Sequence, residues 1–158
     1  MPCIEIAFSN ELLDSTGIGA KNDIKEDLGI KGIEKVRFTE LYYLELDLPA
    51  EKIDEIARMV FLDPIVQTYS IGRGIFPQYD YYVEVRLHAD VTDNLGIVAK
   101  EAIEDFLGKK IEGVVRSAKR YYISGKISQE DAQRMAKGLF ANEIIETYRV
   151  GTRGEGSG

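Results

Sequence analysis

The chain is built from two similar copies of one sequence, joined head to tail. When its 158 residues are compared with themselves at a shift of 79 positions, Asp14 aligns with Asp93 and Tyr43 with Tyr122, without a gap. Of the 70 positions from Cys3 to Gly72, 21 are identical, against roughly one in sixteen expected by chance for ordinary composition. A fixed internal period of this kind indicates gene duplication, so both copies should adopt the same fold.

The repeat predicts the domain organisation. The two copies occupy residues 3–72 and 81–150, and a connector at 73–80 contains the Gly and Pro residues typical of irregular chain. The Gly-rich segment 151–158 is typical of a flexible tail or linker. A linker would join this region to a further domain, so both a free subunit and part of a longer polypeptide remain open.

Each copy begins with a strand and a helix. Apolar residues alternate with polar ones at 4–8 and again at 83–88, which predicts half-buried strands. Asp14 and Asp93 follow at positions where a carboxylate can cap a helix. The helices have apolar residues at a spacing of four, namely Ala20, Ile24 and Leu28 in one copy and Ala99, Ile103 and Leu107 in the other.

The second half of each copy completes an α+β unit. A strand around Val36 precedes another extended run at 43–48, Pro49 fits the start of a second helix, and 65–71 forms a closing strand. Each unit is therefore predicted as β-α-β-β-α-β, an antiparallel sheet with its helices on one face. Because about 70 residues form a marginal core alone, we expect the copies to pair, sheet to sheet or edge to edge, as a pseudo-dimer.

Composition narrows the classes of partner. The net charge of −7 and the lack of a sequence cluster of Lys and Arg interleaved with aromatics argue against nucleic acid. No apolar run approaches the roughly 18 residues needed to span a bilayer, so no membrane is expected. Cys3 is the single cysteine, which fits a reducing compartment, and we expect the cytoplasm.

The sequence offers few groups for catalysis. His88, the only histidine, is expected to be a solvated strand residue. Cys3 lacks the Gly-x-Cys-x-Gly turn that exposes a glutaminase nucleophile, and no Gly-rich phosphate loop is present. We therefore predict no catalytic, cofactor-binding or metal-binding residue, and a binding or scaffold role.

Tyrosines and arginines at equivalent strand positions are candidates for an interface. One ring of each tyrosine pair, Tyr43 and Tyr122, should lie on the outer face of a strand, where tyrosine is enriched at interfaces. Arg37 and Arg116 could pair with carboxylates across the same interface. Cross-strand packing and surface ion pairs remain open as simpler interpretations. Exposed strand edges could also allow self-association.

The order of several short motifs resembles the PurS family, and the tandem region at the N-terminus of long-chain forms of the same synthase. The motifs are Asp14-Ser15-Thr16-Gly17, Leu28-Gly29, Val36-Arg37 and Asp63-Pro64-Ile65-Val66-Gln67-Thr68-Tyr69, with Val91-Thr92-Asp93-Asn94-Leu95-Gly96 and Asn142-Glu143-Ile144-Ile145 in the second copy. The family often has a Gly-Lys pair after its Val-Arg. Lys119 keeps this lysine in the second copy whereas Glu40 replaces it in the first, which adds Lys119 to the candidate interface residues.

The resemblance implies a non-catalytic structural part of phosphoribosylformylglycinamidine (FGAM) synthase in purine biosynthesis. In that family a PurQ-type glutaminase releases ammonia, and a PurL-type synthetase uses it with ATP and magnesium. PurS-type units bridge these two parts and help to seal the ammonia route. The implied chain binds no cofactor of its own.

The two Asp-x-x-Gly segments allow a rival interpretation. They are similar to the ligand loop of ACT domains, where backbone amides at a helix N-terminus hold an amino acid, so a tandem amino-acid sensor is the alternative. The simplest interpretation is structural, because Asp can cap the helix while Gly allows the turn into it.

Overall fold

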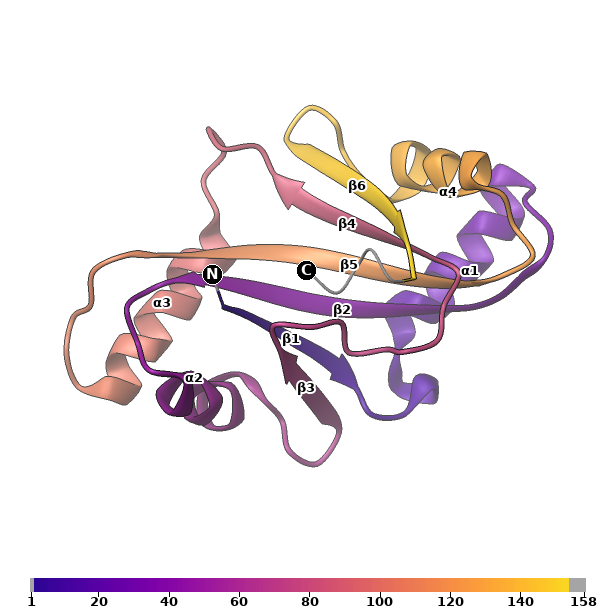
Figure 1. The fold of residues 1–158 in the computed structure, drawn as a ribbon. Helices are drawn as coiled ribbons and strands as arrows, with labels where there is room; N and C mark the ends of the chain where they lie inside the picture. Colours follow the sequence, from indigo (N-terminus) through magenta and orange to yellow (C-terminus); the bar gives the residue numbers. More distant parts are fainter. Residues whose placement is uncertain (1, 154–158) are drawn as a thin grey trace.

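The computed structural model describes residues 2–153 and shows an α+β fold, in which a six-stranded antiparallel sheet carries helices (Figure 1). The strand order across the sheet is β3-β1-β2-β5-β4-β6. Along the chain the elements are β1 (Cys3–Phe8), α1 (Ser15–Leu28), β2 (Ile33–Glu45), α2 (Ala50–Ile56), β3 (Gln67–Ile71), β4 (Tyr81–Leu87), α3 (Asn94–Leu107), β5 (Val114–Gly125), α4 (Gln129–Met135) and β6 (Glu146–Thr152). Short π-helical turns, Ala57–Phe61 and Ala136–Phe140, extend α2 and α4.

The α+β class and the tandem architecture are confirmed, but the predicted β-α-β-β-α-β order within each unit is wrong. Each copy is β-α-β-α-β, because the two middle strands are one long strand, β2 in the first copy and β5 in the second. No Gly or Pro interrupts β2 between Val36 and Leu44. Pairing with β5 along nearly its whole length keeps β2 extended.

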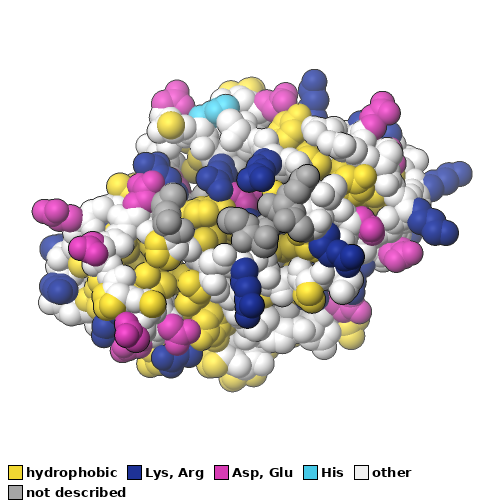
Figure 2. All heavy atoms as spheres, in the orientation of Figure 1, with side chains coloured by type: hydrophobic (Ala, Val, Ile, Leu, Met, Phe, Trp, Pro, Cys, Tyr) yellow, Lys and Arg dark blue, Asp and Glu magenta, His cyan; other side chains and the backbone are white. Residues whose placement is uncertain are grey.

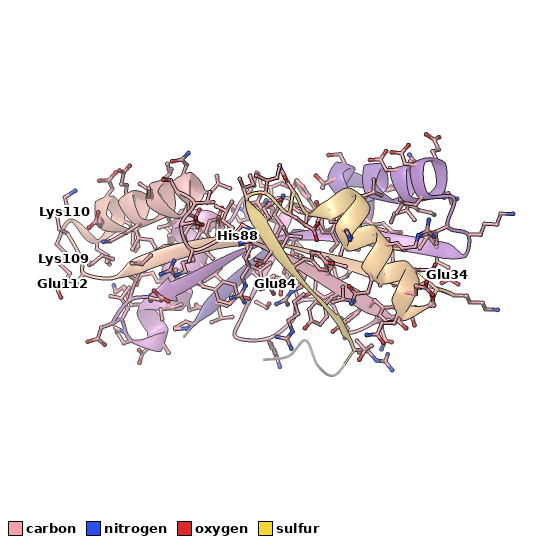
Figure 3. The ribbon with its side chains drawn as sticks, turned by 90° about the horizontal axis from the view of Figure 1, so that it is seen from above. Glu34, Glu84, His88, Lys109, Lys110 and Glu112 are labelled. Carbon is pink, nitrogen blue, oxygen red and sulfur yellow. The ribbon has the colours of Figure 1, made fainter. Side chains whose placement is uncertain are left out.

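The copies join edge to edge, through β2 and β5, and not sheet to sheet. Glu40 pairs with Lys119, which is its own equivalent at the shift of 79 residues. A pseudo-twofold axis therefore passes between these two residues. Figure 3 shows the consequence, since Glu34 at the start of β2 lies at the opposite end of the molecule from Lys109, Lys110 and Glu112, which precede β5.

The helices cover one face of the sheet, as expected. Val36 and Leu44 lie an even number of residues apart in β2, so their side chains point to the same face. Val36 belongs to a core that includes residues of α1 and α4, whereas Leu44 belongs to a second core with residues of α2 and α3. The opposite face of the sheet carries no helix formed by residues 2–153.

Each of the two cores is made by both copies. Ile24 of α1 packs in one core with Val83 of β4 and Met135 of α4, from the second copy. Ile103 of α3 packs in the other core with Ile4 of β1, from the first copy. The first helix of each copy thus fills the core of the other copy, and the two repeats form one interlocked unit.

Paired aspartates fix where the first helices begin. The Asp14 carboxylate accepts from Gly17 N at 2.8 Å, and Asp93 accepts from Gly96 N at the same distance. A Cβ at Gly17 would lie 2.3 Å from the Val36 carbonyl oxygen, so only glycine allows α1 to approach β2 this closely.

The predicted segment boundaries fall near the ends of these elements. The connector at 73–80 links β3 to β4 and crosses the helix-free face in front of the sheet (Figure 1). Strand β6 extends to Thr152, two residues into the segment expected as a tail, and 154–158 lie outside the described residues. Within residues 2–153, every helix is too short or too polar to cross a lipid bilayer.

Candidate functional site

The helix-free face carries charged side chains that are buried. Glu5 in β1 is 2% exposed, and its equivalent Glu84 in β4 is 5% exposed. Arg120 in β5 is also 5% exposed. Burying charges is costly unless they are paired and hydrogen-bonded, so the contacts of these three residues decide whether the face is stable.

Two tyrosine–glutamate hydrogen bonds cross the pseudo-twofold axis reciprocally. Tyr43 of the first copy donates to Glu84 of the second at 2.7 Å, and Tyr122 of the second copy donates to Glu5 of the first at 2.6 Å. Thr39 Oγ1 donates a further bond to Glu5 at 2.6 Å. The tyrosine pairs predicted as interface residues therefore connect the two copies of this chain.

Arg120 lies between the two carboxylates. Its guanidinium donates to Glu84 through Nε at 3.0 Å and through a second nitrogen, and Nη1 lies 3.5 Å from Glu5. Its pseudo-twofold equivalent is Leu41, so one cation serves both carboxylates. No buried side-chain polar atom within residues 2–153 lacks a hydrogen-bond partner.

These contacts set the ionisation of the cluster. Burial by itself raises the pKa of Glu84, but Arg120, Tyr43 and Arg86 lower it by more, so its pKa lies below the ordinary value. Burial and the neighbouring Glu5 raise the pKa of the Cys3 thiol to about 12. At neutral pH Glu84 is therefore an anion, and Cys3 is a protonated thiol and a poor nucleophile.

The connector covers the part of this face around Glu5 of the first copy and Tyr122 of the second. The Phe76 and Tyr79 rings meet the Tyr122 ring edge-on, at centroid distances of 5.1 and 4.9 Å. The backbone N–H of Ile75 donates to Glu5 at 3.2 Å. This cover explains why Glu5, the charged residue of β1, is buried and not solvated.

The two Asp-x-x-Gly segments are engaged in internal contacts. Besides capping α1, Asp14 accepts from the backbone of Phe38 and from Arg37 Nε, both at 2.9 Å. Asp93 likewise accepts from the Ser117 backbone at 2.6 Å. Each carboxylate thus ties the first helix to the long strand, which supports the structural interpretation over a ligand loop.

The five candidate interface residues divide into two groups. Arg37 and Tyr122 are buried, with Arg37 stacked 4.5 Å from the Phe76 ring centroid, because the connector lies over both. Tyr43 is half-buried, and Arg116 lies 3.4 Å from Glu45 with half of its side chain exposed. Lys119 points to the helix face, where it lies 3.3 Å from Glu146. Only the last three are accessible to a partner.

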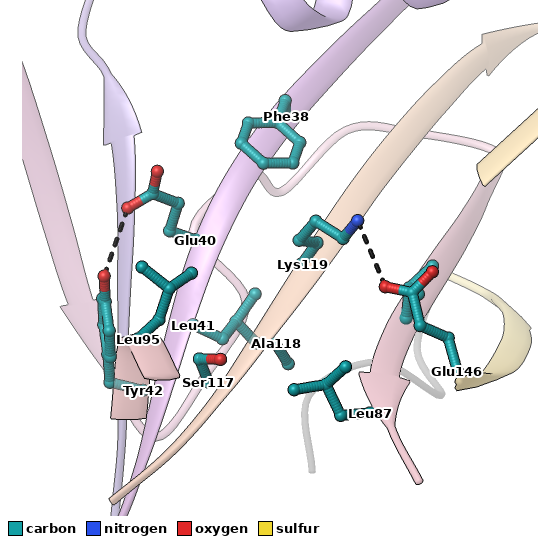
Figure 4. A pocket seen from close by; sticks show the side chains of 11 residues that line it. Phe38, Glu40, Leu41, Tyr42, Leu87, Leu95, Ser117, Ala118, Lys119 and Glu146 are labelled. Atoms are coloured by element: carbon teal, nitrogen blue, oxygen red, sulfur yellow. Dashed lines mark hydrogen bonds and ion pairs between the residues drawn. The ribbon is translucent and has the colours of Figure 1, made fainter. Parts of the chain in front are cut away.

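A small cavity lies on the helix face beside the pseudo-twofold axis (Figure 4). Its volume is about 220 Å³, and Phe38, Tyr42, Leu87 and Leu95 are among the apolar residues that line it. Its charged side chains already have partners, since Glu40 accepts from Tyr42 and Lys119 pairs with Glu146. The cavity therefore offers a mainly apolar surface and no free charged group.

The other chemical candidates occupy ordinary structural positions. His88 is partly exposed, and its Nε2 lies 3.0 Å from the Glu143 carbonyl oxygen. Across residues 2–153, no group of three or more His, Cys, Asp or Glu is arranged to hold a metal ion.

Sequence reasoning missed five residues of the helix-free face: Glu5, Glu84, Arg86, Arg120 and Arg149. The burial of Glu5 depends on the connector and left no local signal. The three arginines did leave a signal in the sequence, because the first copy has no arginine at the equivalent positions. Those positions are occupied by Ala7, Leu41 and Ser70.

One family model matches the sequence in both copies. The model of the family described as PurS, phosphoribosylformylglycinamidine (FGAM) synthase, matches residues 3–73 and 80–154. Among solved structures, PurS of Methanocaldococcus jannaschii, one of the subunits of formylglycinamide ribonucleotide amidotransferase in the purine biosynthetic pathway, is 25% identical. That comparison covers 47% of this chain and 94% of the other, with a TM-score of 0.35. Comparison with curated proteins gives no significant match.

Proposed function

Because the chain belongs to the PurS family of FGAM synthase, we propose that it is the non-catalytic part that bridges the glutaminase and the synthetase of that enzyme in de novo purine biosynthesis. The observation that carries the proposal is the family match in both repeats, 3–73 and 80–154. Two PurS units in one chain make a complete pseudo-dimer without a second subunit.

The interlocked fold suits a bridge between two enzymes. A protein that holds two catalytic sites at a fixed distance and orientation must be rigid. In this chain both hydrophobic cores and the Glu5–Arg120–Glu84 cluster join the two copies and supply that rigidity. In this proposal a PurQ-type glutaminase and a PurL-type synthetase are the partners, in the cytoplasm. ATP and magnesium act at the synthetase, and this chain contributes shape.

Sealing the ammonia route is the finer part of the proposal. Ammonia that meets bulk water is protonated and lost as a nucleophile, so the route between the two catalytic sites must exclude solvent. A folded wall can do this without a reactive group. The protonated Cys3 and the carboxylates held by hydrogen bonds fit such a passive role.

We predict that this protein is needed for the glutaminase and the synthetase to assemble. Native mass spectrometry of the three purified proteins should show a complex containing all three. Without this chain, the glutaminase and the synthetase should remain apart. Assembly of those two to the same extent in its absence would contradict the bridging role.

A further inference from the structure

Three exposed arginines of the second repeat lie on the helix-free face. They are Arg86 in β4, Arg116 in β5 and Arg149 in β6, here called the arginine patch. Their chain neighbours Val85, Val115 and Val150 pack in the cores beneath the helices. Because side chains alternate along a strand, the arginines point to the opposite, helix-free face. Figure 2 shows this face, with dark blue Lys and Arg side chains across its middle.

The first repeat lacks such a patch. The positions equivalent to Arg86 and Arg149 are Ala7 and Ser70. Arg37 is equivalent to Arg116, but it is bound to Asp14 and the Phe8 carbonyl oxygen and lies beside Phe76. The same backbone therefore folds without exposed arginines at these positions. Folding alone does not account for the patch.

Positive charge is in excess at the patch. Arg86 and Arg120 together balance the two buried carboxylates, Glu84 and Glu5, so the excess comes from the other two arginines. Arg116 has only a 3.4 Å contact with Glu45. Arg149 has no carboxylate within salt-bridge distance among residues 2–153, and its guanidinium carbon lies 6.0 Å from the Tyr82 ring centroid. This excess stands out in a chain whose net charge is −7.

Within the patch, Arg86 is held in place before any partner arrives. The Arg86 guanidinium carbon lies 4.2 Å over the Tyr43 ring, and its Nε is held by Glu84. An arginine held in this way loses less side-chain entropy on binding than a free one. The patch also reaches β6, an outer strand of the sheet, where a partner can approach.

We propose that the arginine patch docks an acidic surface of a protein partner. The inference rests on the proposed function, which makes that partner the glutaminase or the synthetase. An acidic protein repels the acidic surface of a partner everywhere except at a cluster of exposed cations. The arginine patch therefore attracts such a surface and orients it on this face. Three guanidinium groups on three neighbouring strands match several carboxylates better than one small anion.

The consequence is one docking face for each chain. The connector covers Glu5 and Arg37 of the first repeat. Its Phe76 and Tyr79 rings also contact Tyr122 of the second. The second repeat presents the arginines. The two repeats therefore differ on this face, because the connector covers buried polar groups whereas the second repeat presents exposed arginines. Two identical subunits in a homodimer would each present the same surface.

Neutralising the patch tests the proposal. The double variant Arg116→Gln, Arg149→Gln should bind the glutaminase–synthetase pair about ten-fold more weakly than the wild-type protein at low salt. The difference should shrink at high salt, because salt screens exposed charges. The matched control, Lys109→Gln with Lys137→Gln, removes two exposed charges elsewhere and should bind like wild type. Thermal unfolding of each variant checks that the fold is kept.

Each outcome decides the matter. If the arginine variant binds the glutaminase–synthetase pair as tightly as wild type, or if the lysine control is weakened equally, the docking role of the arginine patch is wrong. Neither result contradicts the proposed function. A wild-type chain that binds neither catalytic protein overturns both. Self-association of the chain alone that depends on Arg149, seen by sedimentation, or arginine-dependent binding of inorganic phosphate would assign the patch to another occupant and also overturn the proposal.

Discussion

Replacing Arg120 with leucine should destabilise the protein by about 3–5 kcal/mol, the usual cost of removing one partner from a buried ion pair. Leucine already stands at the equivalent Leu41, so the side chain suits the strand. The loss comes from leaving Glu5 and Glu84 buried without their shared cation. Urea unfolding at neutral pH measures it, and Arg58→Leu, which breaks an exposed helical ion pair with Asp54, should change the stability much less.

The pH dependence of the stability difference between wild type and Arg120→Leu shows whether the buried carboxylates cause it. In the wild-type protein the pKa of Glu84 lies below the ordinary glutamate value of 4.5, so the stability that ionised Glu84 contributes is present above 4.5 and is lost as the pH falls through its folded pKa. In the Arg120→Leu variant, Glu84 keeps only Arg86 as its cation, so protonating it costs less than in the wild-type protein. The difference between the two proteins should therefore narrow below pH 4.5. An equal difference at neutral and acidic pH would contradict this explanation.

Neither repeat should fold as a monomer when it is produced alone. The first repeat by itself would leave Ile24 of α1 without Val83 and Met135, and it would lack Ile103 of α3 in its own core. Half of each core is then exposed to water, at a cost of roughly 25 cal/mol for each Å² of apolar surface. Circular dichroism and urea unfolding should show no cooperative transition for a monomeric half.

A chain cut only within the connector is the matched control. It contains the same residues, and β2 and β5 still pair along the centre of the sheet, so the two pieces should stay associated and unfold cooperatively. Mixing the separate halves should regenerate this complex. A monomeric half that unfolds with a sharp transition would show that the cores are not interlocked.

Local patterns predicted the parts of the fold that depend on neighbouring residues. Asp14 indicated where α1 begins, and the shift of 79 residues gave the pseudo-twofold relation. The strand count failed because composition alone does not show whether an extended run continues. The length of β2 is settled by its pairing with β5, a contact that joins residues far apart in the sequence.

The site was harder to predict for the same reason. Alternation in β1 and β4 placed Glu5 and Glu84 opposite the apolar residues, but alternation does not show what covers that face. The cover comes from the connector, whose Phe76 and Tyr79 show no regular pattern. Comparing the two copies would have drawn attention to Arg86, because its equivalent in the first copy is Ala7. Placing the arginines on one face, however, required the strand register.

The coupling between glutamine and product tests the proposed role most directly. The purified glutaminase and synthetase are supplied with glutamine and ATP, and the FGAM formed is measured against the glutamine hydrolysed, with and without this protein. We predict close to one product for each glutamine when the chain is present and a much lower ratio when it is absent, while turnover with added ammonium stays unchanged. An unchanged ratio in its absence would contradict the account.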